Sequence, residues 1–281
     1  MSLTLGGNNS GSLRALAYMN TTKEKMDRSL ERIASGNKLL SARDDSGGLA
    51  VAMKLESQIS SYDAQKDSVN NAISYVESQS TALGTASSIV IKMQDLKSDY
   101  DDPTASVQDK AAYEAEFQDL RKQLDSLKGE TLNGTQLFNR ADGNMTVSDV
   151  TLTNLDLNAA LQNNDSSGNG SQNLGDSSVT AVTLNTITNT NLTNISNSVS
   201  GLVAEAAGDE STLGFASDYL TSMSTNLATA RGRIMDVDYA EESTNYATLS
   251  LQYEAAAAAV AQANTSAARV FDLIIGSIRR D

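Results

Sequence analysis

The sequence of 281 residues contains no cysteine, no histidine and no tryptophan, and its one proline is Pro103. The lack of cysteine excludes disulfides, thiol catalysis and zinc–thiolate sites. The lack of histidine removes the commonest general base and the commonest metal ligand. These absences argue against an enzyme, and we expect no cofactor and no metal. A single proline leaves long helices uninterrupted.

Basic residues are also scarce. The chain has 21 Lys and Arg against 35 Asp and Glu, which gives a net charge of −14. A nucleic-acid-binding protein would show a basic patch or stripe, so we expect no nucleic-acid partner. No window approaches the ~18 apolar residues of a membrane helix, so we expect no membrane partner. The N-terminus, MSLTLGGNNSGS, lacks the basic and apolar regions of a cleaved secretory signal. We therefore expect a cytoplasmic protein, or one exported without such a signal.

Apolar residues recur at spacings of three and four along much of the chain, which is the period of amphipathic helices and coiled coils. The longest stripe predicts a helix of roughly 45 to 50 residues that stops before Pro103. The short connection to the next stripe suggests that those two helices pack antiparallel. The sequence thus predicts a mainly α fold built as a long coiled-coil rod. The stripes run over residues 13–33, 49–93, 113–127, 216–237 and 249–274.

Between Asn133 and about Gly201, Asn, Ser, Thr and Gly dominate. Short alternating runs rich in Thr and Val predict strands or hairpins. These runs are 145–147, 150–152 and 179–184. Residues 163–175 are nearly all turn formers and predict a surface loop. We therefore expect a small β-hairpin region and a polar surface segment over about 140–200.

Adjacent carboxylates occur at Asp44-Asp45, Asp101-Asp102 and Glu241-Glu242. Neighbouring residues of a helix or strand do not face each other, so these pairs are poor acid–base dyads. We interpret them as helix-start charges favoured by the helix dipole.

The stripes at both termini need a partner, because a lone amphipathic helix is marginal in water. Burying each Leu or Val of the last stripe gains roughly 1.5 to 3 kcal/mol only once that partner exists. The partner is the first helix of the same chain, the same helices of other subunits, or both. Two ends that must meet are more typical of assembly than of catalysis.

Two long segments resemble the signatures of bacterial flagellins. Residues 29–59, SLERIASGNKLLSARDDSGGLAVAMKLESQI, are similar to the N-terminal signature through Leu30, Ile33, Ser35, Gly36, Ser41, Ala42, Asp44, Asp45, Gly48, Leu49 and Ala50. Residues 228–242, ATARGRIMDVDYAEE, are similar to the C-terminal one through Arg231, Arg233, Ile234, Asp236, Asp238, Tyr239, Ala240 and Glu242. The closing Ala261-Gln262-Ala263-Asn264 and the turn at 130–138 also match. The resemblance spans about residues 10–140 and 200–281.

The resemblance implies a fold of flagellin core domains only. Residues 1–44 and 238–281 would form the inner-tube coiled coil, and 45–237 the helical rod with its β-hairpin. The expected interdomain junction consists of Asp44, Asp45, Arg233, Asp236 and Asp238. The expected assembly residues of the terminal helices are Leu13, Leu16, Met26, Leu30, Ile33, Leu249, Tyr253, Val260, Val270 and Ile274.

The resemblance also implies a function, namely a structural subunit that polymerises with copies of itself into an extracellular flagellar filament for swimming motility. Further expected partners are a flagellar export chaperone, the type III export apparatus, and the hook-associated and cap proteins. The chain would be disordered before about Asp44 and after about Asp238 until it assembles. The alternatives are a hook–filament junction protein, or an exported enzyme carried on flagellin-like ends.

An innate immune receptor recognises flagellins through a motif similar to Val90–Leu96 on the second helix. Here Lys92 and Gln94 stand where the motif has arginines. Lysine cannot make the planar bidentate contact of arginine, and glutamine is uncharged. The candidate recognition face is Lys92, Gln94, Asp95 and Leu96, and an ordinary solvated helix face is the alternative.

Overall fold

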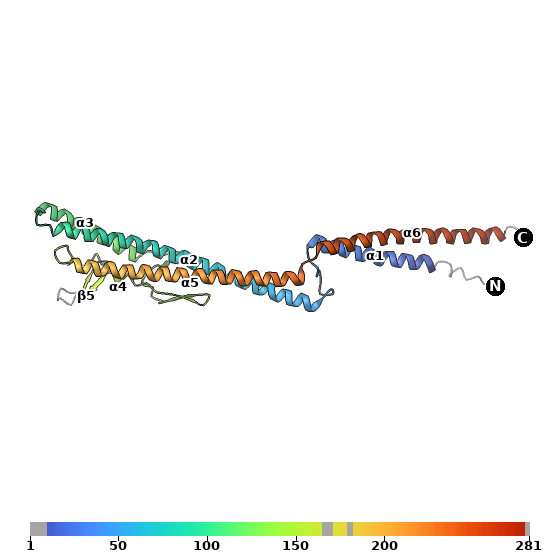
Figure 1. Cartoon of the computed structure of the whole chain (residues 1–281), viewed down its shortest axis with the longest axis horizontal. Coiled ribbons are helices and arrows are strands. Elements are labelled where there is room, and N and C mark those ends of the chain that lie inside the picture. The colour runs from blue at the N-terminus through green and yellow to red at the C-terminus, as the bar shows by residue number, and fades with distance from the viewer. Residues whose placement is uncertain (1–9, 165–170, 179–181, 279–281) are drawn as a thin grey trace. The chain divides into compact units, whose positions relative to one another are not determined.

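The computed structural model describes residues 10–164, 171–178 and 182–278. The chain forms two compact units (Figure 1). Unit 1 comprises Met1–Gln58 and Asn226–Asp281, and unit 2 comprises Ile59–Thr225. Helices α2 (Ser46–Tyr100) and α5 (Asn189–Met235) contribute residues to both units. Among the described residues, no helix is both long and apolar enough to cross a membrane.

Unit 1 is built around two terminal helices, α1 (Ser10–Ser35) and α6 (Tyr239–Ile278). They lie side by side in Figure 1 and run antiparallel, so that the end of α1 lies beside the start of α6. The predicted first and last helices are therefore confirmed. Contacts also group residues 45–58 and 226–237 with this unit. The domain limits of 44/45 and 237/238 stay a prediction.

Unit 2 has its core where α2, α3 (Val107–Lys128) and α5 run together (Figure 1). The predicted long helix is confirmed and extends over 55 residues. Its buried side chains keep the 3–4 spacing that the sequence predicts. Each buried Val or Leu contributes roughly 1.5 to 3 kcal/mol of hydrophobic free energy. The main core residues are Val69, Val76, Leu83, Val90 and Met93 on α2, Phe117 and Leu124 on α3, and Leu192, Ile195, Val199, Leu213 and Leu220 on α5.

Among the described residues, three antiparallel two-stranded pairs cover part of this core. Strands β3 (Met145–Val147) and β4 (Val150–Leu152) pair with Val147 opposite Val150, which confirms the predicted hairpin. Strands β1 (Thr131–Leu132) and β2 (Thr135–Gln136) flank Asn133 and Gly134, whose φ angles of 51° and 82° suit a type I′ turn. Helix α4 (Leu157–Ala160) follows β4. Strands β5 (Gln162–Asn164) and β6 (Ser171–Asn173) form the third pair.

The structure corrects three predictions for the middle of the chain. Residues 162–164 and 171–173 are strands, although 163–175 was predicted as a loop throughout. Residues 182–184 form no strand, because they cross the core as irregular chain with Val182 and Leu184 buried; residues 179–181 lie outside the described residues. Helix α5 begins at Asn189, 27 residues before the predicted stripe at 216.

The segment 140–200 is therefore not only a polar surface. Its sparse leucines fill the core, as do the first apolar residues of α5. A helical stripe at Leu192, Ile195 and Val199 was present in the sequence but was hidden among Asn, Ser and Thr. Buried members of the segment before α5 are Leu152, Leu155, Leu157, Leu161, Leu174, Val182, Leu184 and Ile187.

A buried arginine holds part of this segment against α3. Arg121 is fully buried and donates hydrogen bonds to the carbonyl oxygens of Val182 (3.2 Å), Leu174 (3.4 Å) and Asp176. Burial lowers the pKa of the Arg121 guanidinium, and the nearby Asp176, Glu114 and Asp125 oppose that shift. Because backbone carbonyl groups accept these bonds, Arg121 fixes the irregular segment that contains Asp176 and Val182 against helix α3.

The acidic pairs divide into two kinds. Asp45 and Glu241-Glu242 lie at helix starts, as predicted. Asp101 and Asp102 do not, because they follow the end of α2, where Asp101 pairs with Lys97 at 2.6 Å. Helix α3 begins instead with a capping box in which the Ser106 hydroxyl accepts from the Asp109 N–H.

The charge of the chain is divided unequally between the units. Unit 1 has thirteen basic and thirteen acidic residues, whereas unit 2 has eight and twenty-two. The whole net charge of −14 therefore belongs to unit 2. Unit 1 is electroneutral, which reduces the repulsion between copies that pack closely.

Candidate assembly site

The face of α1 that packs against α6 is made mainly of small and polar residues. Ser12, Thr22 and Ser29 are buried there, with half-buried Ala15, Met19, Met26 and Ile33 between them at spacings of three and four. Small side chains allow two helices to approach closely. The matching side chains of α6 are Glu242, Tyr246, Leu249, Tyr253, Ala256, Val260 and Ala263.

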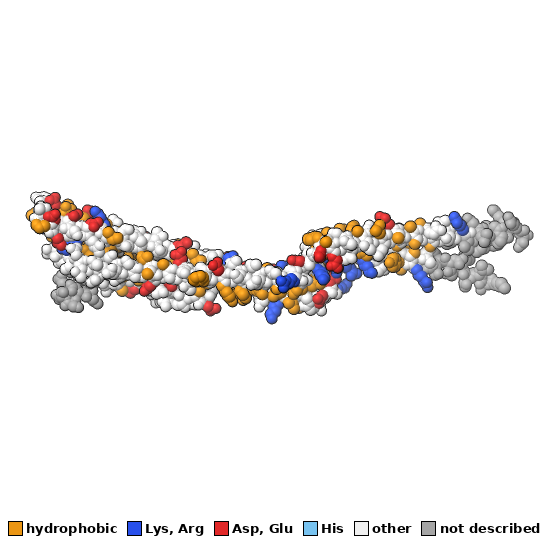
Figure 2. Space-filling view, in the orientation of Figure 1, with side chains coloured by type: hydrophobic (Ala, Val, Ile, Leu, Met, Phe, Trp, Pro, Cys, Tyr) orange, Lys and Arg blue, Asp and Glu red, His pale blue; other side chains and the backbone are white. Residues whose placement is uncertain are grey.

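The three leucines of α1 stay outside this seam. Leu13 is 62% exposed, Leu16 41% and Leu30 51%. Figure 2 shows hydrophobic side chains on the visible surface of the α1–α6 pair. The single subunit therefore covers one side of α1 and leaves a row of leucines in water, where each is unfavourable by roughly 1.5 to 3 kcal/mol relative to burial.

The structure thus separates eight of the ten assembly residues expected from the sequence into two sets. Met26, Ile33, Leu249, Tyr253 and Val260 are half-buried in the intramolecular pair. Leu13, Leu16 and Leu30 are exposed. The side chains of Val270 and Ile274 lie outside the described ones.

At the junction, the segment that follows α1 and the segment that precedes α6 are hydrogen-bonded to each other through their backbones. Asn37 and Asp236 form an antiparallel bridge. The Val237 N–H donates to the Gly36 carbonyl at 3.0 Å, and the Lys38 N–H donates to the Met235 carbonyl at 2.6 Å. Gly36 has φ of 73°, which supports its predicted role at the end of the helix.

Asp44 and Asp45 have different structural roles at this junction: Asp44 closes a loop and Asp45 caps a helix. The Asp44 carboxylate accepts from the N–H groups of Leu40 (3.1 Å) and Ser41 (3.2 Å), which closes the loop before α2. These bonds, the Leu40 bond foremost, together with nearby Arg32 and Arg28 lower the pKa of the Asp44 carboxyl group, against a smaller opposing effect of burial. Asp45 caps α2, because its Oδ1 accepts from the Gly48 N–H at 2.9 Å.

Arg32 links the three parts of the junction, although it was not among the predicted site residues. Its Nη2 lies 3.8 Å from Asp44 Oδ1, and its Nη1 lies 3.9 Å from Glu242 Oε2. The guanidinium therefore lies between the loop and the start of α6. The available sequence signal was its place between Leu30 and Ile33 in the matched N-terminal signature.

The remaining junction residues come from the returning chain. Asp238 caps α6 by accepting from the N–H groups of Ala240 and Glu241 at 2.9 and 3.2 Å. Asp236 contributes its backbone, whereas Arg233 is exposed. A second link missed from sequence joins Arg231 Nε to Glu56 Oε2 at 2.8 Å, between the end of α5 and the start of α2.

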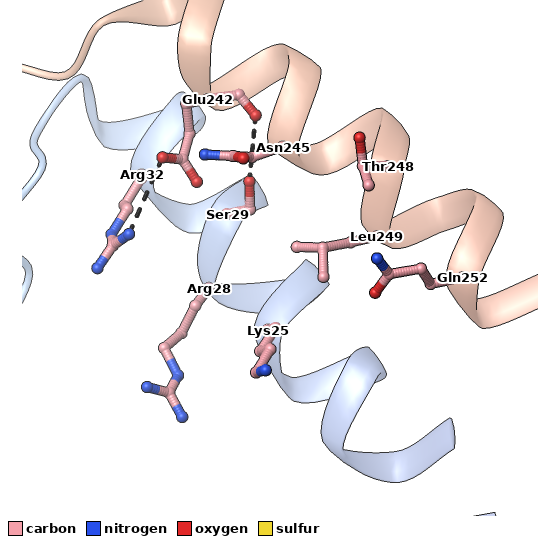
Figure 3. Close-up of a pocket in the computed structure, with 9 residues that line it drawn as sticks. All are labelled: Lys25, Arg28, Ser29, Arg32, Glu242, Asn245, Thr248, Leu249 and Gln252. Atoms are coloured by element: carbon pink, nitrogen blue, oxygen red, sulfur yellow. Dashed lines mark hydrogen bonds and ion pairs between the residues drawn. The ribbon is translucent and has the colours of Figure 1, made fainter. Parts of the chain in front are cut away.

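A polar groove of about 400 Å³ lies between α1 and α6 next to Arg32 (Figure 3). Figure 3 shows Ser29 and Arg32 directed at Glu242, with Arg28 and Lys25 further toward the N-terminus of α1. The Ser29 hydroxyl donates to the Glu242 carbonyl at 3.4 Å. On α6 the groove is lined by Asn245, Thr248, Leu249 and Gln252.

The candidate immune-recognition face lies on α2 in unit 2. Lys92 and Asp95 are exposed, and Lys92 Nζ lies 3.9 Å from Glu116 Oε1 on α3. Gln94 is half-buried. Leu96 is only 2% exposed and belongs to the core, so it does not share an accessible face with the other three.

No cluster of three Asp or Glu side chains positioned to hold a metal ion occurs within the described part of the chain. The candidate site instead consists of the paired helices α1 and α6, the exposed leucines of α1, and the hydrogen-bonded backbone of residues 36–38 and 235–237.

Comparisons with known proteins cover most of the chain. The family of the bacterial flagellin N-terminal helical region matches residues 7–143, and that of the bacterial flagellin C-terminal helical region matches residues 186–274. The two matches include α1 to α3, the junction, all of α5 and most of α6.

Individual relatives are similar over shorter stretches. Flagellin A of Vibrio anguillarum is 30% identical over 144 residues, which is 51% of this chain and 38% of the relative. A flagellin of Listeria innocua is 30% identical over 154 residues, 55% of this chain and 50% of the relative. A flagellin of Listeria monocytogenes is 32% identical over 120 residues, 43% and 42% respectively. The chain spans half or less of the length of these curated relatives.

Proposed function

Since this chain belongs to the bacterial flagellin family, we propose that it is a structural subunit that polymerises with copies of itself into the flagellar filament for swimming motility. The observation that carries the proposal is the set of exposed leucines on α1, Leu13, Leu16 and Leu30, which stay outside the seam where α1 packs against α6. Leucines left in water on a helix that is already paired indicate a further partner. Other subunits supply that partner in a polymer.

The neutral charge of unit 1 supports the same proposal, because electroneutral surfaces pack at high density with little repulsion. The acidic unit 2 would then keep the polymer soluble. We propose residues 1–44 with 238–281 as the inner-tube domain and 45–237 as the rod domain.

We propose that the filament lies outside the cell and that the function is structural rather than enzymatic. Proposed partners besides the chain itself are the export chaperone, the export apparatus, and the hook-associated and cap proteins. Lys92, Gln94 and Asp95 remain the proposed immune-recognition face, with Leu96 supporting it from the core.

The decisive experiment compares polymerisation of the wild-type chain and a Leu13→Gln/Leu30→Gln variant. We expect seeded wild-type chain to form long helical tubes visible by negative-stain electron microscopy. We expect the variant to stay unpolymerised with unchanged helicity by circular dichroism, because both leucines are exposed in the subunit. A matched control is Val107→Gln, which alters an 81% exposed apolar residue at the start of α3 and should leave the tubes intact.

Short caps or no polymer from the wild-type chain would instead favour a hook–filament junction protein. We also propose that α1 and α6 become ordered on assembly. Hydrogen exchange of dilute chain tests this, since strong protection before Asp44 and after Asp238 would contradict it.

A further inference from the structure

The groove between α1 and α6 contains more positive than negative charge. Lys25, Arg28 and Arg32 follow one another at spacings of three and four, which places them on one face of α1. The acidic residue that lines the same groove is Glu242, and its side chain is 11% exposed and lies beside Arg32. Two cations therefore have no counter-charge within the groove.

The adjoining hollow balances Arg28 only in part, because Asp44 lies near enough for Arg28 to lower its pKa but forms its ion pair with Arg32. It is lined by Arg28, Arg43, Glu31 and Asp44, with Leu40 and Ser41. Asp44 already accepts two backbone hydrogen bonds and lies near Arg32. Among the residues the structure describes, neither Lys25 nor Arg28 forms an ion pair.

The missing negative charge is present elsewhere in the same unit. Glu241 and Glu254 are exposed on α6, and Glu24 and Asp27 on α1, and none of them forms an ion pair with another described residue. Unit 1 is thus neutral as a whole but leaves charges of both signs unmatched. Such a surface is complementary to a second copy of itself.

The lining of the groove suits a carboxylate in particular. Arginine binds a carboxylate with two parallel N–H groups, and lysine adds a point charge. The amides of Asn245 and Gln252 provide neutral donors on the opposite wall. A volume of about 400 Å³ accommodates a whole acidic side chain.

We propose that this groove is the socket for a carboxylate side chain of a second copy of this chain, with Lys25 and Arg28 as its binding cations. The inference rests on the proposed polymerisation and names a contact within it. In the polymer this contact orients neighbouring α1–α6 pairs, because a bidentate pair fixes direction as well as distance.

Zero-length crosslinking of assembled filaments tests the socket. Isotopically heavy and light full-length chains are mixed, polymerised and treated with a water-soluble carbodiimide. This reagent joins a lysine amine to a carboxylate in contact with it, forming an amide while the reagent takes up the lost oxygen and becomes a urea. We expect a heavy–light hybrid peptide that contains Lys25, detected by mass spectrometry.

Two variants give the assay its controls. Lys25→Arg keeps the positive charge but has no amine, so we expect filaments to form and the hybrid peptide to be lost. Lys23→Arg changes an exposed lysine of the same helix that does not line the groove, and should leave the product unchanged.

Filaments in which Lys25 crosslinks only within one chain, or not at all, would overturn the proposal. A further measurement on such filaments is whether they dissociate at a higher temperature in phosphate than in chloride of equal ionic strength. That result would show that the groove binds a free anion instead of a carboxylate of a second copy. Comparison with a Lys25→Gln/Arg28→Gln variant assigns that effect to the groove. Failure of the wild-type chain to polymerise would refute the proposed function itself.

Discussion

The N–H of Val237 donates a hydrogen bond to the carbonyl oxygen of Gly36 at 3.0 Å, although the two residues are 201 positions apart. This bond closes the outgoing and returning chain into one crossing beside the α1–α6 pair. The crossing joins the two segments that carry the flagellin signatures, because Gly36 belongs to one and Val237 to the other. Its geometry explains why a glycine and two helix caps occur at these positions.

Gly36→Ala should weaken the crossing by about 1 to 2 kcal/mol, because a left-handed conformation is costly for residues with a Cβ atom. The backbone at Gly36 has φ of 73°, and a Cβ atom there would lie 2.9 Å from the Tyr239 hydroxyl oxygen. The measurement is the thermal dissociation midpoint of filaments. Gly11→Ala is the control, since a Cβ atom at Gly11 meets nothing within 4 Å. Equal midpoints for the two variants would contradict the role of Gly36.

Asp44→Asn should reduce the acid sensitivity of the junction. The pKa of Asp44 is lowered in the folded state, so the unfolded chain binds the proton more tightly. The stabilisation by Asp44 is therefore complete above the unfolded value of about 3.9 and is lost as the pH falls through the lower folded value. Filament stability measured between neutral pH and pH ~3 should fall less steeply for the variant. Parallel pH profiles for wild type and variant would argue against this assignment.

Arg121→Met should destabilise unit 2 by about 2 to 5 kcal/mol, because buried carbonyl groups lose their donor. The carbonyls of Leu174, Val182 and Asp176 are the groups affected. Urea unfolding followed by circular dichroism gives the free energy. Arg121→Lys keeps the charge but not the planar donor fork, so an intermediate loss is expected.

The matched control for Arg121 is Lys122→Met. Lys122 is exposed and pairs with Asp119 on the helix surface at 2.8 Å, a type of pair that contributes at most about 1 kcal/mol. A loss at Lys122 as large as that at Arg121 would show that the measurement reports helix α3 in general.

Gly208→Ala should stabilise unit 2 by about 0.5 to 1 kcal/mol, because alanine has less backbone entropy to lose in a helix. A Cβ atom at Gly208 meets nothing within 4 Å. Gly175→Ala is the opposite case, since its Cβ atom would lie 2.6 Å from Leu161 Cδ1 and 3.2 Å from Lys128 Cδ. Overpacking there should cost about 1 to 3 kcal/mol. Urea unfolding of both variants checks the two signs.

Prediction from sequence succeeded where one element carries its own signal. The 3–4 spacing of Val69, Ile73 and Val76 specifies a helix and its buried face without reference to any partner. The β3–β4 hairpin follows from alternating Thr and Val. The start of α5 was missed because Leu192, Ile195 and Val199 are surrounded by residues that favour turns, and their burial in the core of unit 2 overrides that local preference.

The candidate site was predicted in part. The helix-start role of Asp45 was predicted because its signal is local, whereas Asp238, which caps α6, was expected at the junction only through the resemblance to flagellins. Arg32 and the Arg231–Glu56 pair were missed, since each joins segments distant in sequence.

The sequence by itself determined that this chain is a long-helix protein with matching apolar stripes at its two ends, because periodicity and glycine positions act within a few residues. Only the tertiary structure decided which residues of α1 pack against α6 and which stay exposed. Small residues such as Ser29 pack against α6, and Leu13 and Leu30 remain exposed. Hydrophobic spacing reveals that a face must be buried, but the identity of its partner depends on which helices meet in space.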